Sequence, residues 1–546
     1  MSTRLQVAAL FLLASPALAQ APLTGGSALP IPGATANERA GDALSFDGAH
    51  AVVGVPFRAS TASQVGAAVV FPRTAGGFGT PTVLAPPTPS PNGMFGGDVA
   101  LEGTELIVTE RASLHFGLPV RGAFHRYRLV SGTWALIDSS ASPTSTASSA
   151  FGASCDRDGD LLVVGAPFAV VSGGTRGAAY VYREVGGQGQ VESMLAASDG
   201  QAGDRFGDSV AVSGERILIG GAWRMEGGQQ VGAAYAFERI GGTWLETGRF
   251  APDPSTADRA MGVAVDIDGT TAVIGAARTN ARGATYVFVD GGAGWSLEQR
   301  LQPSNLGNFA TFGDAVAVRG DALVVGAYQD TARGNLSGSA WVFERGGATW
   351  SAIVRLTTGM PSAAFFGQGV ALDGAGAFLV GEPLRTPPGG ASTAGAVYAF
   401  EPQRPFGTPY CAPVTHSGGR LGRLSALGSD VVANGEVTLV AYDLPFSAFG
   451  FFLTSRAQGS VPQPGGSQGV LCLGGSIGRY VGPGQVLNTA NTGVLELELD
   501  LSATPQPTGL VSIVAGETWS FQTWFRDTIG GLSSSNFTEG LEIQFR

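Results

Sequence analysis

Lysine is missing from this chain of 546 residues, and all 32 basic residues are arginine. Without lysine the protein cannot form a lysine Schiff base, hold phosphates with a P-loop lysine, or use a Ser-x-x-Lys nucleophile. Histidine is also scarce, and the four copies lack the spacing of metal ligands: His50, His115, His125 and His416. These absences exclude several classes of enzyme and leave no candidate metal-ligand set.

Charged residues are few as well, at 14% of the chain, and the acidic excess gives a formal charge of −11. This charge argues against nucleic-acid binding, because phosphate contacts need a basic face. A hydrophobic content of 44% argues against disorder, and 84 glycines with 31 prolines indicate a folded chain rich in turns. The length predicts two or more domains.

No apolar run is long enough to span a bilayer. The N-terminus has the features of a signal peptide over residues 1–19: Arg4, the short apolar run Val7–Leu13 and the small residues of Ala17–Ala19. We therefore expect the protein to be exported and to be secreted or held at the cell surface. Its mature form should begin near Gln20. Its three cysteines then lie in an oxidising compartment, where they can pair.

Regularly spaced glycines divide most of the chain into seven repeats. Successive anchor glycines are 55, 56, 55, 55, 51 and 54 residues apart, at Gly41, Gly96, Gly152, Gly207, Gly262, Gly313 and Gly367. Seven residues after each anchor comes a second glycine, at Gly48, Gly103, Gly159, Gly214, Gly269, Gly320 and Gly374. Such a fixed period is the signature of a repeat architecture.

Each repeat contains four short apolar runs separated by turn residues. In the sixth repeat these are "AVAV", "LVVGA", "GSAWVF" and a run that opens at Trp350 after a Gly-Gly turn. The second glycine joins the first two runs as a tight hairpin, in which it supplies the positive φ. Four antiparallel strands in about fifty residues are typical of one propeller blade. The sequence therefore predicts an all-β, seven-bladed β-propeller over residues 22–403.

The tripeptide Arg319-Gly320-Asp321 is the one that animal cell-surface receptors read on their ligands. Gly320 is the second glycine that every repeat possesses, and its neighbours correspond to Ser213 and Glu215 around Gly214. We therefore interpret this segment as a hairpin turn rather than as an adhesion signal.

The seventh repeat ends near Phe400 without a fourth run. In four repeats the fourth run opens with an aromatic residue: Phe78, Trp134, Trp244 and Trp295. Each lies seventeen residues before the residue that precedes the next anchor glycine. The same count back from Ala40 reaches Leu23, in "PLTGGSALPIPG". We expect this N-terminal segment to supply the outer strand of the last blade, which joins the chain ends and removes unpaired sheet edges.

The pattern "FG…VA…G…LVVGAP…GAAYVF" resembles the FG-GAP repeat of integrin α chains, in its bacterial secreted version. Repeats 1 and 3 also keep the proline of the motif, at Pro56 and Pro167. Many integrin-type repeats carry a calcium loop, whereas the turns here are too short to surround an ion with six to eight oxygens. The closest approach is Asp156, Asp158 and Asp160, which we interpret as turn and solvated residues, with a bound ion as the alternative.

Residues 406–546 have the alternating pattern of a β-sandwich, which predicts a smaller C-terminal domain. The tail resembles the C-terminal module of secreted planctomycete proteins in its Tyr-Cys start, Leu-Cys-Gly-Gly middle and "WSFQTWFRD" strand. Cys411 and Cys472 both lie in this tail, and we expect a disulfide between them. Cys155 lies in the first run of repeat 3, and we expect it to be a buried small side chain.

Residues that could perform chemistry are few. "GGSQG" and "GGSIG" match G-x-S-x-G, but neither precedes a helical pattern, as a nucleophile elbow requires. One polar set lies in repeat 2, where Glu110, Arg111, His115 and His125 could stand near one propeller face. The tail contains a second, in Asp443, Glu517, Arg526 and Asp527. We expect polar loop and strand-end residues in both places, and therefore no catalytic, cofactor-binding or metal-ligating residue.

Three functions remain open. The leading hypothesis is a monomeric, secreted, non-enzymatic propeller that binds an extracellular protein or glycan, with adhesion as the family-level analogy. The second is a structural envelope or matrix protein whose tail acts as an anchor or sorting module. The third is an extracellular hydrolase, which requires Glu110, His115 and His125 to converge.

Overall fold

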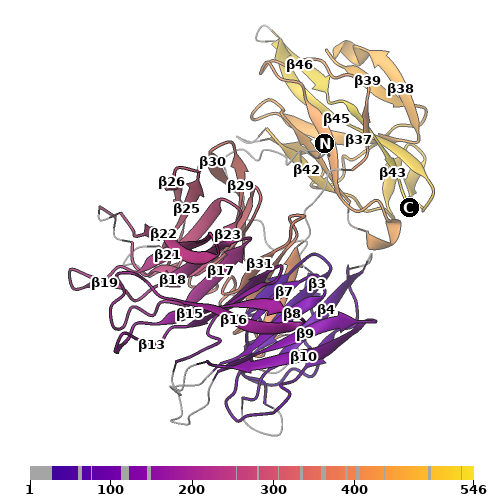
Figure 1. Ribbon diagram of the computed structural model, residues 1–546. Coiled ribbons are helices and arrows are strands. Elements are labelled where there is room, and N and C mark those ends of the chain that lie inside the picture. The colour runs from indigo at the N-terminus through magenta and orange to yellow at the C-terminus, as the bar shows by residue number, and fades with distance from the viewer. Residues whose placement is uncertain are drawn as a thin grey trace. The chain divides into compact units, whose positions relative to one another are not determined.

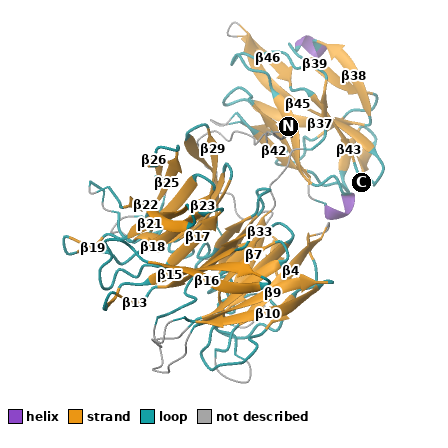
Figure 2. Ribbon diagram, viewed as in Figure 1, coloured by secondary structure: helices purple, strands orange, loops and turns teal. Residues whose placement is uncertain are grey.

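The computed structural model describes residues 27–546 except 60–63, 75–76, 112–121, 144–148, 254, 257, 279–281, 305, 332–335, 358–363, 388–391, 401–405, 436, 490–492 and 530–531. The described residues form strands and two short 3-10 helices, η2 (Val432–Asn434) and η3 (Pro464–Gly466) (Figure 2). The all-β prediction is confirmed. The chain divides into two compact units between residues 402 and 403. The predicted signal peptide lies outside the described residues, among which no helix could cross a membrane.

Seven antiparallel sheets form the first unit, and we call them blades 1 to 7 in chain order (Figure 1). Blade 1 contains β2 (Leu44–Phe46), β3 (His50–Val55), β4 (Ala67–Thr74), β5 (Gly77–Phe78) and β6 (Thr82–Leu84). Blade 2 contains β7 (Phe95–Glu102), β8 (Glu105–Glu110), β9 (Ala123–Val130) and β10 (Thr133–Ala141). Blade 3 contains β11 (Cys155–Asp158), β12 (Leu161–Ala166), β15 (Ala178–Val185) and β16 (Gln188–Leu195).

The remaining blades repeat this order. Blade 4 contains β17 (Ser209–Ser213), β18 (Arg216–Gly221), β21 (Ala233–Ile240) and β22 (Thr243–Phe250). Blade 5 contains β23 (Met261–Asp268), β24 (Thr271–Ala276), β25 (Ala284–Asp290) and β26 (Trp295–Leu301). Blade 6 contains β27 (Ala315–Arg319), β28 (Ala322–Ala327), β29 (Ser339–Gly346) and β30 (Thr349–Leu356). Blade 7 contains β31 (Val370–Leu372), β32 (Phe378–Glu382), β33 (Ala396–Phe400) and β1 (Ser27–Leu29).

Two small hairpins extend the loops between the second and third strands of blades 3 and 4. They are β13 (Val170–Val171) with β14 (Gly174–Thr175), and β19 (Met225–Glu226) with β20 (Gln229–Gln230).

The blades close into a ring. Their first strands contact one another in the order β2, β7, β11, β17, β23, β27 and β31, and β31 contacts β2 again. Apolar side chains fill the space between neighbouring sheets: Leu218 and Ala236 of blade 4, for example, share a core with Ile274 and Tyr286 of blade 5. The hydrophobic effect therefore stacks the blades face to face.

The N-terminal strand completes the last blade. β1 pairs antiparallel with β33, with Ala28 opposite Tyr398. The strand lies within the segment that the repeat register predicts, four residues after Leu23, which itself lies outside the described residues. A parallel bridge between Ala40 and Gly395 also joins the first repeat to the last.

Most anchor glycines lie directly before the first strands, whereas Gly96 and Gly262 fall within β7 and β23. In blade 6 the backbone N–H of Asp314 donates to the carbonyl of Thr311 at 3.1 Å, and Gly313 has a φ of 95°. This is the geometry of a type II turn, which requires a positive φ at its third residue. Glycine is also needed at Gly338, where a Cβ would lie 2.1 Å from the carbonyl oxygen of Phe366 in the next repeat.

The RGD segment is a hairpin turn, as predicted. Arg319 pairs with Ala322 across β27 and β28, and Gly320 has a φ of 56°. The same prediction is wrong for Gly374, which lacks a positive φ. Blade 7 instead has a longer connection between Leu372 and Phe378, in which Gly376 takes the left-handed conformation.

The second unit consists of two packed sheets and two hairpins. The larger sheet contains β34 (Thr408–Tyr410), β37 (Phe449–Ser455), β40 (Gly478–Arg479), β41 (Leu487–Asn488), β45 (Thr518–Ile529), β46 (Leu532–Phe537) and β47 (Gly540–Gln544). The smaller contains β35 (Arg423–Gly428), β36 (Val437–Tyr442) and β42 (Leu495–Glu498). The hairpins are β38 (Ala457–Pro462) with β39 (Val470–Gly474), and β43 (Thr504–Gln506) with β44 (Gly509–Val511). Both sheets contribute to one core, with Leu439 and Leu497 against Phe452 and Trp519.

Candidate functional site

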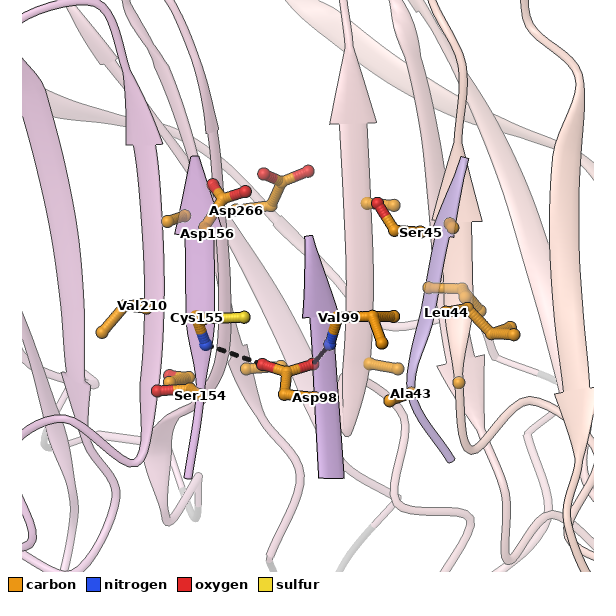
Figure 3. A pocket seen from close by; sticks show the side chains of 18 of the residues that line it. Ala43, Leu44, Ser45, Asp98, Val99, Ser154, Cys155, Asp156, Val210 and Asp266 are labelled. Carbon is orange, nitrogen blue, oxygen red and sulfur yellow. Dashed lines mark hydrogen bonds between the residues drawn. The ribbon is translucent and has the colours of Figure 1, made fainter. Parts of the chain in front are cut away.

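A cavity of about 710 Å³ lies inside the ring of first strands (Figure 3). All seven first strands and the turns before them contribute to its lining. Its middle is apolar, with side chains three residues after each anchor: Leu44, Val99, Cys155, Val210, Val265, Val316 and Val370. Its two ends are polar. We call the end beside the anchor glycines the anchor end, and the end beside the second glycines the hairpin end.

Several cavity carboxylates connect neighbouring blades. Asp98 of blade 2 accepts a hydrogen bond from the backbone N–H of Cys155 in blade 3, at 2.8 Å (Figure 3). Asp156 accepts from Val212 in the same way, and Asp266 accepts from Val318. The first strand of a blade has an unpaired edge toward the channel, and these side chains satisfy its N–H groups.

A second set of such contacts lies at the hairpin end. In four blades the backbone N–H of the second glycine donates to a side-chain oxygen of the preceding blade. The acceptor is in each case the residue directly before that blade's own second glycine: Gly159 donates to Glu102, Gly214 to Asp158, Gly269 to Ser213 and Gly320 to Asp268. The distances are 2.6 to 3.0 Å.

The "CDRDGD" carboxylates therefore have structural partners. Asp156 and Asp158 each bind a backbone N–H of blade 4, and Asp160 pairs with Arg183 at 2.8 Å. The interpretation of Asp156 as a solvated residue is wrong: it is partly buried and bridges two blades. Among the described residues, no group of three acidic, histidine or cysteine side chains has metal-binding geometry.

Burial changes the ionisation of the cavity carboxylates. It raises the pKa of Asp156 to about 7, with nearby Asp266 adding to the shift. It raises the pKa of Asp98, Asp208 and Asp314 to about 6, although arginine side chains oppose the shift in each case. Desolvation dominates because the charged form of a carboxylate loses its hydration when buried.

The anchor end carries four hydrogen-bond acceptors, of which Asp42 accepts from Arg39 at 3.4 Å. Asp42, Asp208, Asp314 and Gln368 each follow an anchor glycine directly and line the cavity. No hydrogen bond within the described residues reaches the carboxylate of Asp208 or Asp314. The Oε1 atom of Gln368 is buried and also lacks a partner there. An alignment of the repeats could have predicted this set, because all four residues directly follow an anchor glycine.

Arginines stacked on aromatic rings surround this end. The guanidinium of Arg205 lies 3.8 Å from the ring centroid of Trp223, and Arg278 lies 5.1 Å from the same ring. Arg39 lies 5.4 Å from the ring of Phe57, which lines the cavity. Cation–π contacts hold these arginines beside the acceptors.

Polar groups of a different kind lie within the blades. The hydroxyl of Tyr286, three residues after Gly283, donates to Asp258 at 2.5 Å, and Arg300 on the adjacent strand pairs with the same carboxylate. Blade 4 has the same arrangement in Tyr235, Arg249 and Asp199. We call each such set a blade pin. It consists of a donor on the third strand of a blade, the residue opposite it on the fourth strand, and a carboxylate. Blade pins satisfy polar groups that the packed sheets bury.

Glu110 and His125 do come together, but as a blade pin. His125 lies three residues after Gly122, in the position of Tyr286, and its Nε2 is 3.3 Å from Glu110. Its Nδ1 is 2.9 Å from the hydroxyl of Ser139 on the adjacent strand.

This Ser–His–Glu row differs from a hydrolase triad. The acid contacts Nε2 and the serine Nδ1, the reverse of the order in serine proteases. Glu110 also occupies the position of Glu382, which accepts from Tyr398 in blade 7. None of the three side chains lines the cavity. His115 lies outside the described residues.

The other candidate sites do not assemble. In "GGSQG" the hydroxyl of Ser467 is buried and donates to the carbonyl of Ser535, and no helix follows. In the tail, Asp443 pairs with Arg420, and Asp527 accepts from the N–H of Ser417. Glu517 pairs with Arg456, and Arg526 is exposed.

The cysteines lie as expected. Cys411 and Cys472 form a disulfide, with their Cα atoms 6.2 Å apart. It ties the first strand of the second unit, β34, to β39, and the hydroxyl of Tyr410 donates to the carbonyl of Cys472. Cys155 is a buried free cysteine, and burial raises the pKa of its thiol.

Comparison with known proteins agrees with this architecture. The family model described as the FG-GAP repeat matches residues 190–237 and 295–343. Each match begins at the outer strand of one blade and ends in the third strand of the next. The chain carries FG-GAP repeats. The resemblance found in the sequence is therefore confirmed for these two segments of the propeller.

Two solved structures are similar to this chain at low identity. One is a chain of the structure titled "Crystal Structure of Mitotic Checkpoint Complex", with 13% identity over 73% of this chain and 99% of that chain, and a TM-score of 0.42. Another is a putative 6-phosphogluconolactonase from Bacteroides uniformis, with 11% identity over 59% and 86%, and a TM-score of 0.38. Neither likeness bears on function. None of the curated proteins matches this sequence.

Proposed function

We propose that this FG-GAP protein is a secreted, non-enzymatic binding protein that recognises an extracellular protein or glycan at the anchor end of its propeller. One observation carries the proposal: the central cavity is lined by three acceptors, Asp208, Asp314 and Gln368, that have no hydrogen-bond donor within the described residues. A closed scaffold with unsatisfied polar groups in a concave site is the usual form of a ligand site. The disulfide and the signal-like N-terminus support an extracellular location.

The hydrolase alternative is weaker. It relied on Glu110 and His125, and both have the role of a blade pin outside the cavity. A structural envelope role explains the ring and its buried bridges, but it gives no reason for acceptors without partners at one end. We therefore place recognition at the propeller.

Binding of the exported full chain to cell-wall glycans and to live cells tests the proposal. Saturable binding should survive EDTA, because the cavity carboxylates at the hairpin end already bind backbone N–H groups. It should also survive the double change Arg319→Ala, Asp321→Ala, because this segment is a turn. Absence of binding to every surface, or turnover of an ester or glycoside that is lost in Glu110→Gln, would overturn the proposal.

A further inference from the structure

We infer that two arginines on the anchor-end loops, Arg205 and Arg278, form with Trp223 a docking surface for a carboxylate-bearing segment of a partner protein. We call these three residues the arginine–tryptophan platform. This inference rests on the proposed function and names the kind of partner that the propeller recognises.

Both guanidinium groups of the platform lie over one indole ring. That of Arg205 is 3.8 Å from the ring centroid of Trp223, and that of Arg278 is 5.1 Å from it. Arg205 also lies 4.9 Å from the ring of Phe168 in blade 3. A stacked guanidinium keeps the N–H groups at the edge of its plane free, because a cation–π contact uses only its face. The two groups therefore present hydrogen-bond donors beside the same tryptophan.

Neither guanidinium has an acceptor among the described residues. No hydrogen bond and no ion pair within this part of the chain reaches Arg205 or Arg278. Several other arginines of the anchor-end loops and strand ends do have carboxylate partners: Arg58, Arg224, Arg300 and Arg355. A guanidinium is a fork of donors that matches the two oxygens of a carboxylate. The two unpaired forks therefore indicate an acceptor from outside the chain.

The fold does not require an arginine at position 205. This residue lies two positions before the anchor glycine Gly207 and has a left-handed φ of 56°. Blades 3 and 5 carry Ala150 and Ala260 at the same position, with φ values of 51° and 53°. A left-handed backbone is unfavourable for residues other than glycine, and a long side chain does not relieve this cost. Arg205 is therefore better explained by what its guanidinium binds than by the turn it occupies.

A buried ion pair holds the platform in place. Trp223 donates its backbone N–H to the carbonyl of Asp204, the residue before Arg205, at 3.3 Å. The carboxylate of Asp204 lies 3.2 Å from the guanidinium of Arg224, and both residues are buried. The backbone segments that carry Arg205 and Trp223 are thereby fixed to each other. Little conformational freedom of this surface is then lost on binding, which favours affinity.

The charge around the platform favours a single carboxylate over a polyanion. Burial raises the pKa of Asp208 and both platform arginines oppose the shift, so the three groups lie close together, although no ion pair joins them. The neighbouring cavity is acidic, since eleven of the residues that line it are aspartate or glutamate and four are arginine. An acidic polysaccharide would be repelled by this cavity, whereas one carboxylate at the platform meets two guanidinium groups and one aspartate.

Apolar side chains close in sequence to the platform suit a protein partner. Met225 follows Trp223 by two residues and is 46% exposed, and Val170 follows Phe168 by two residues and is 48% exposed. They belong to β19 and β13, in the small hairpins that extend the anchor-end loops of blades 4 and 3 (Figure 1). Aromatic residues, arginine and methionine are enriched in protein–protein interfaces. The inferred partner therefore combines an aspartate, glutamate or C-terminal carboxylate with apolar neighbours.

Selection from a random peptide library displayed on phage, with the full exported chain as target, tests the inference. The enriched peptides should share a carboxylate next to apolar residues. Synthetic copies should bind Arg205→Gln and Arg278→Gln about 10- to 100-fold more weakly, the usual effect of losing a hydrogen bond to a charged group. Asp208→Asn should instead tighten binding by up to about 5-fold, because it removes an opposing charge.

The matched control is Arg526→Gln, which removes an exposed arginine from the second unit and should leave affinity unchanged. Arg205→Gln should keep the Tm of the unmodified chain, because two other blades carry alanine at its position. Replacing the carboxylate of a selected peptide by an amide should abolish the difference between the unmodified chain and the two platform variants. This last result distinguishes loss of a carboxylate contact from a general change in the surface.

The inference is overturned if no peptide is enriched, if the enriched peptides lack a carboxylate, or if neither platform variant changes affinity. Binding of heparin or pectate in preference to the peptides would assign the two arginines to an anionic glycan and overturn it as well. So would a preference for lysine-bearing peptides, which would place the partner in the acidic cavity. If binding to cell surfaces persists unchanged in both platform variants, the inference fails and the proposed function stands.

Discussion

Asp330 illustrates how a single buried carboxylate stabilises a blade. It is fully buried, accepts a hydrogen bond from the hydroxyl of Ser339 at 2.6 Å and pairs with Arg355, which is 1% exposed. The guanidinium of Arg355 also lies 5.1 Å from the ring of Trp341. Neither ion could remain charged there alone, because desolvation of an unpaired charge costs several kcal/mol.

We therefore expect Asp330→Asn to be strongly destabilising. Removing one partner of a buried pair leaves the other charge uncompensated, at a cost of about 3–5 kcal/mol. Asp321→Asn in the exposed turn of the same blade should change the free energy of unfolding by less than about 0.5 kcal/mol. Urea unfolding of the two variants measures both values. Equal stabilities would show that Arg355 finds another partner.

At the scale of the strand, glycine allows the blades to approach at the ring axis. Gly275 lies in β24, the second strand of blade 5. A Cβ at this position would lie 1.8 Å from the carbonyl oxygen of Gly313 in the next repeat. Gly220 and Gly326 occupy the same position in blades 4 and 6, with distances of 2.0 Å and 1.9 Å to the next anchor glycine.

Gly275→Ala should accordingly push two blades apart. Overpacking of this kind costs roughly 1–3 kcal/mol, and contact with backbone rather than a side chain places this case at the upper end. The control is Gly291→Ala in the same blade, where nothing lies within 4 Å of the added Cβ. Thermal unfolding should show a large fall in Tm for the first variant only. A small fall for Gly275→Ala would mean that the ring can widen without loss.

At the scale of the whole molecule, the ring depends on a strand from the other end of the sequence. β1 covers Val397–Ala399 of β33, and without it the last blade has an open edge. Deleting residues 21–32 should therefore lower Tm and promote aggregation through that edge. Size-exclusion chromatography and thermal melts of the deletion variant measure both effects. A monomeric variant with an unchanged Tm would contradict this role for β1.

The buried carboxylates should also give the propeller an unusual pH dependence. Their pKa in the folded state is raised from 3.8 to about 7 for Asp156 and to about 6 for Asp98, Asp208 and Asp314. The folded state then binds more protons than the unfolded state between pH 4 and 7, so this contribution to stability is full below about pH 4 and is lost as pH rises through 7.

We expect Tm to be higher at pH 5 than at pH 8. Asp156→Asn keeps an oxygen that can accept from Val212 and removes the buried charge, so it should raise Tm at pH 8 and flatten the profile. Asp321→Asn should leave the profile unchanged. The account is wrong if Tm falls steadily from pH 8 to pH 5 in the unmodified protein.

The sequence by itself determined the repeat architecture, because each blade is a local unit of strands and turns. Glycine spacing placed the hairpin at Gly320 and the closing segment at the N-terminus, and the two cysteines of the tail indicated the disulfide. The prediction from local sequence was wrong at Gly374, because the connection between the first two strands of blade 7 is longer. It was also wrong at Asp156, which the sequence suggests is a solvated turn residue.

Only the tertiary structure decided what the polar residues do. The contact between Asp156 and Val212 joins positions 56 residues apart, and Arg73 reaches Asp373 across 300 residues. Such partners are set by ring closure, which no local pattern encodes. The pairing of His125 with Glu110 depends likewise on strand register within blade 2, and the acceptors at Asp208, Asp314 and Gln368 share a cavity only because the ring brings their blades together.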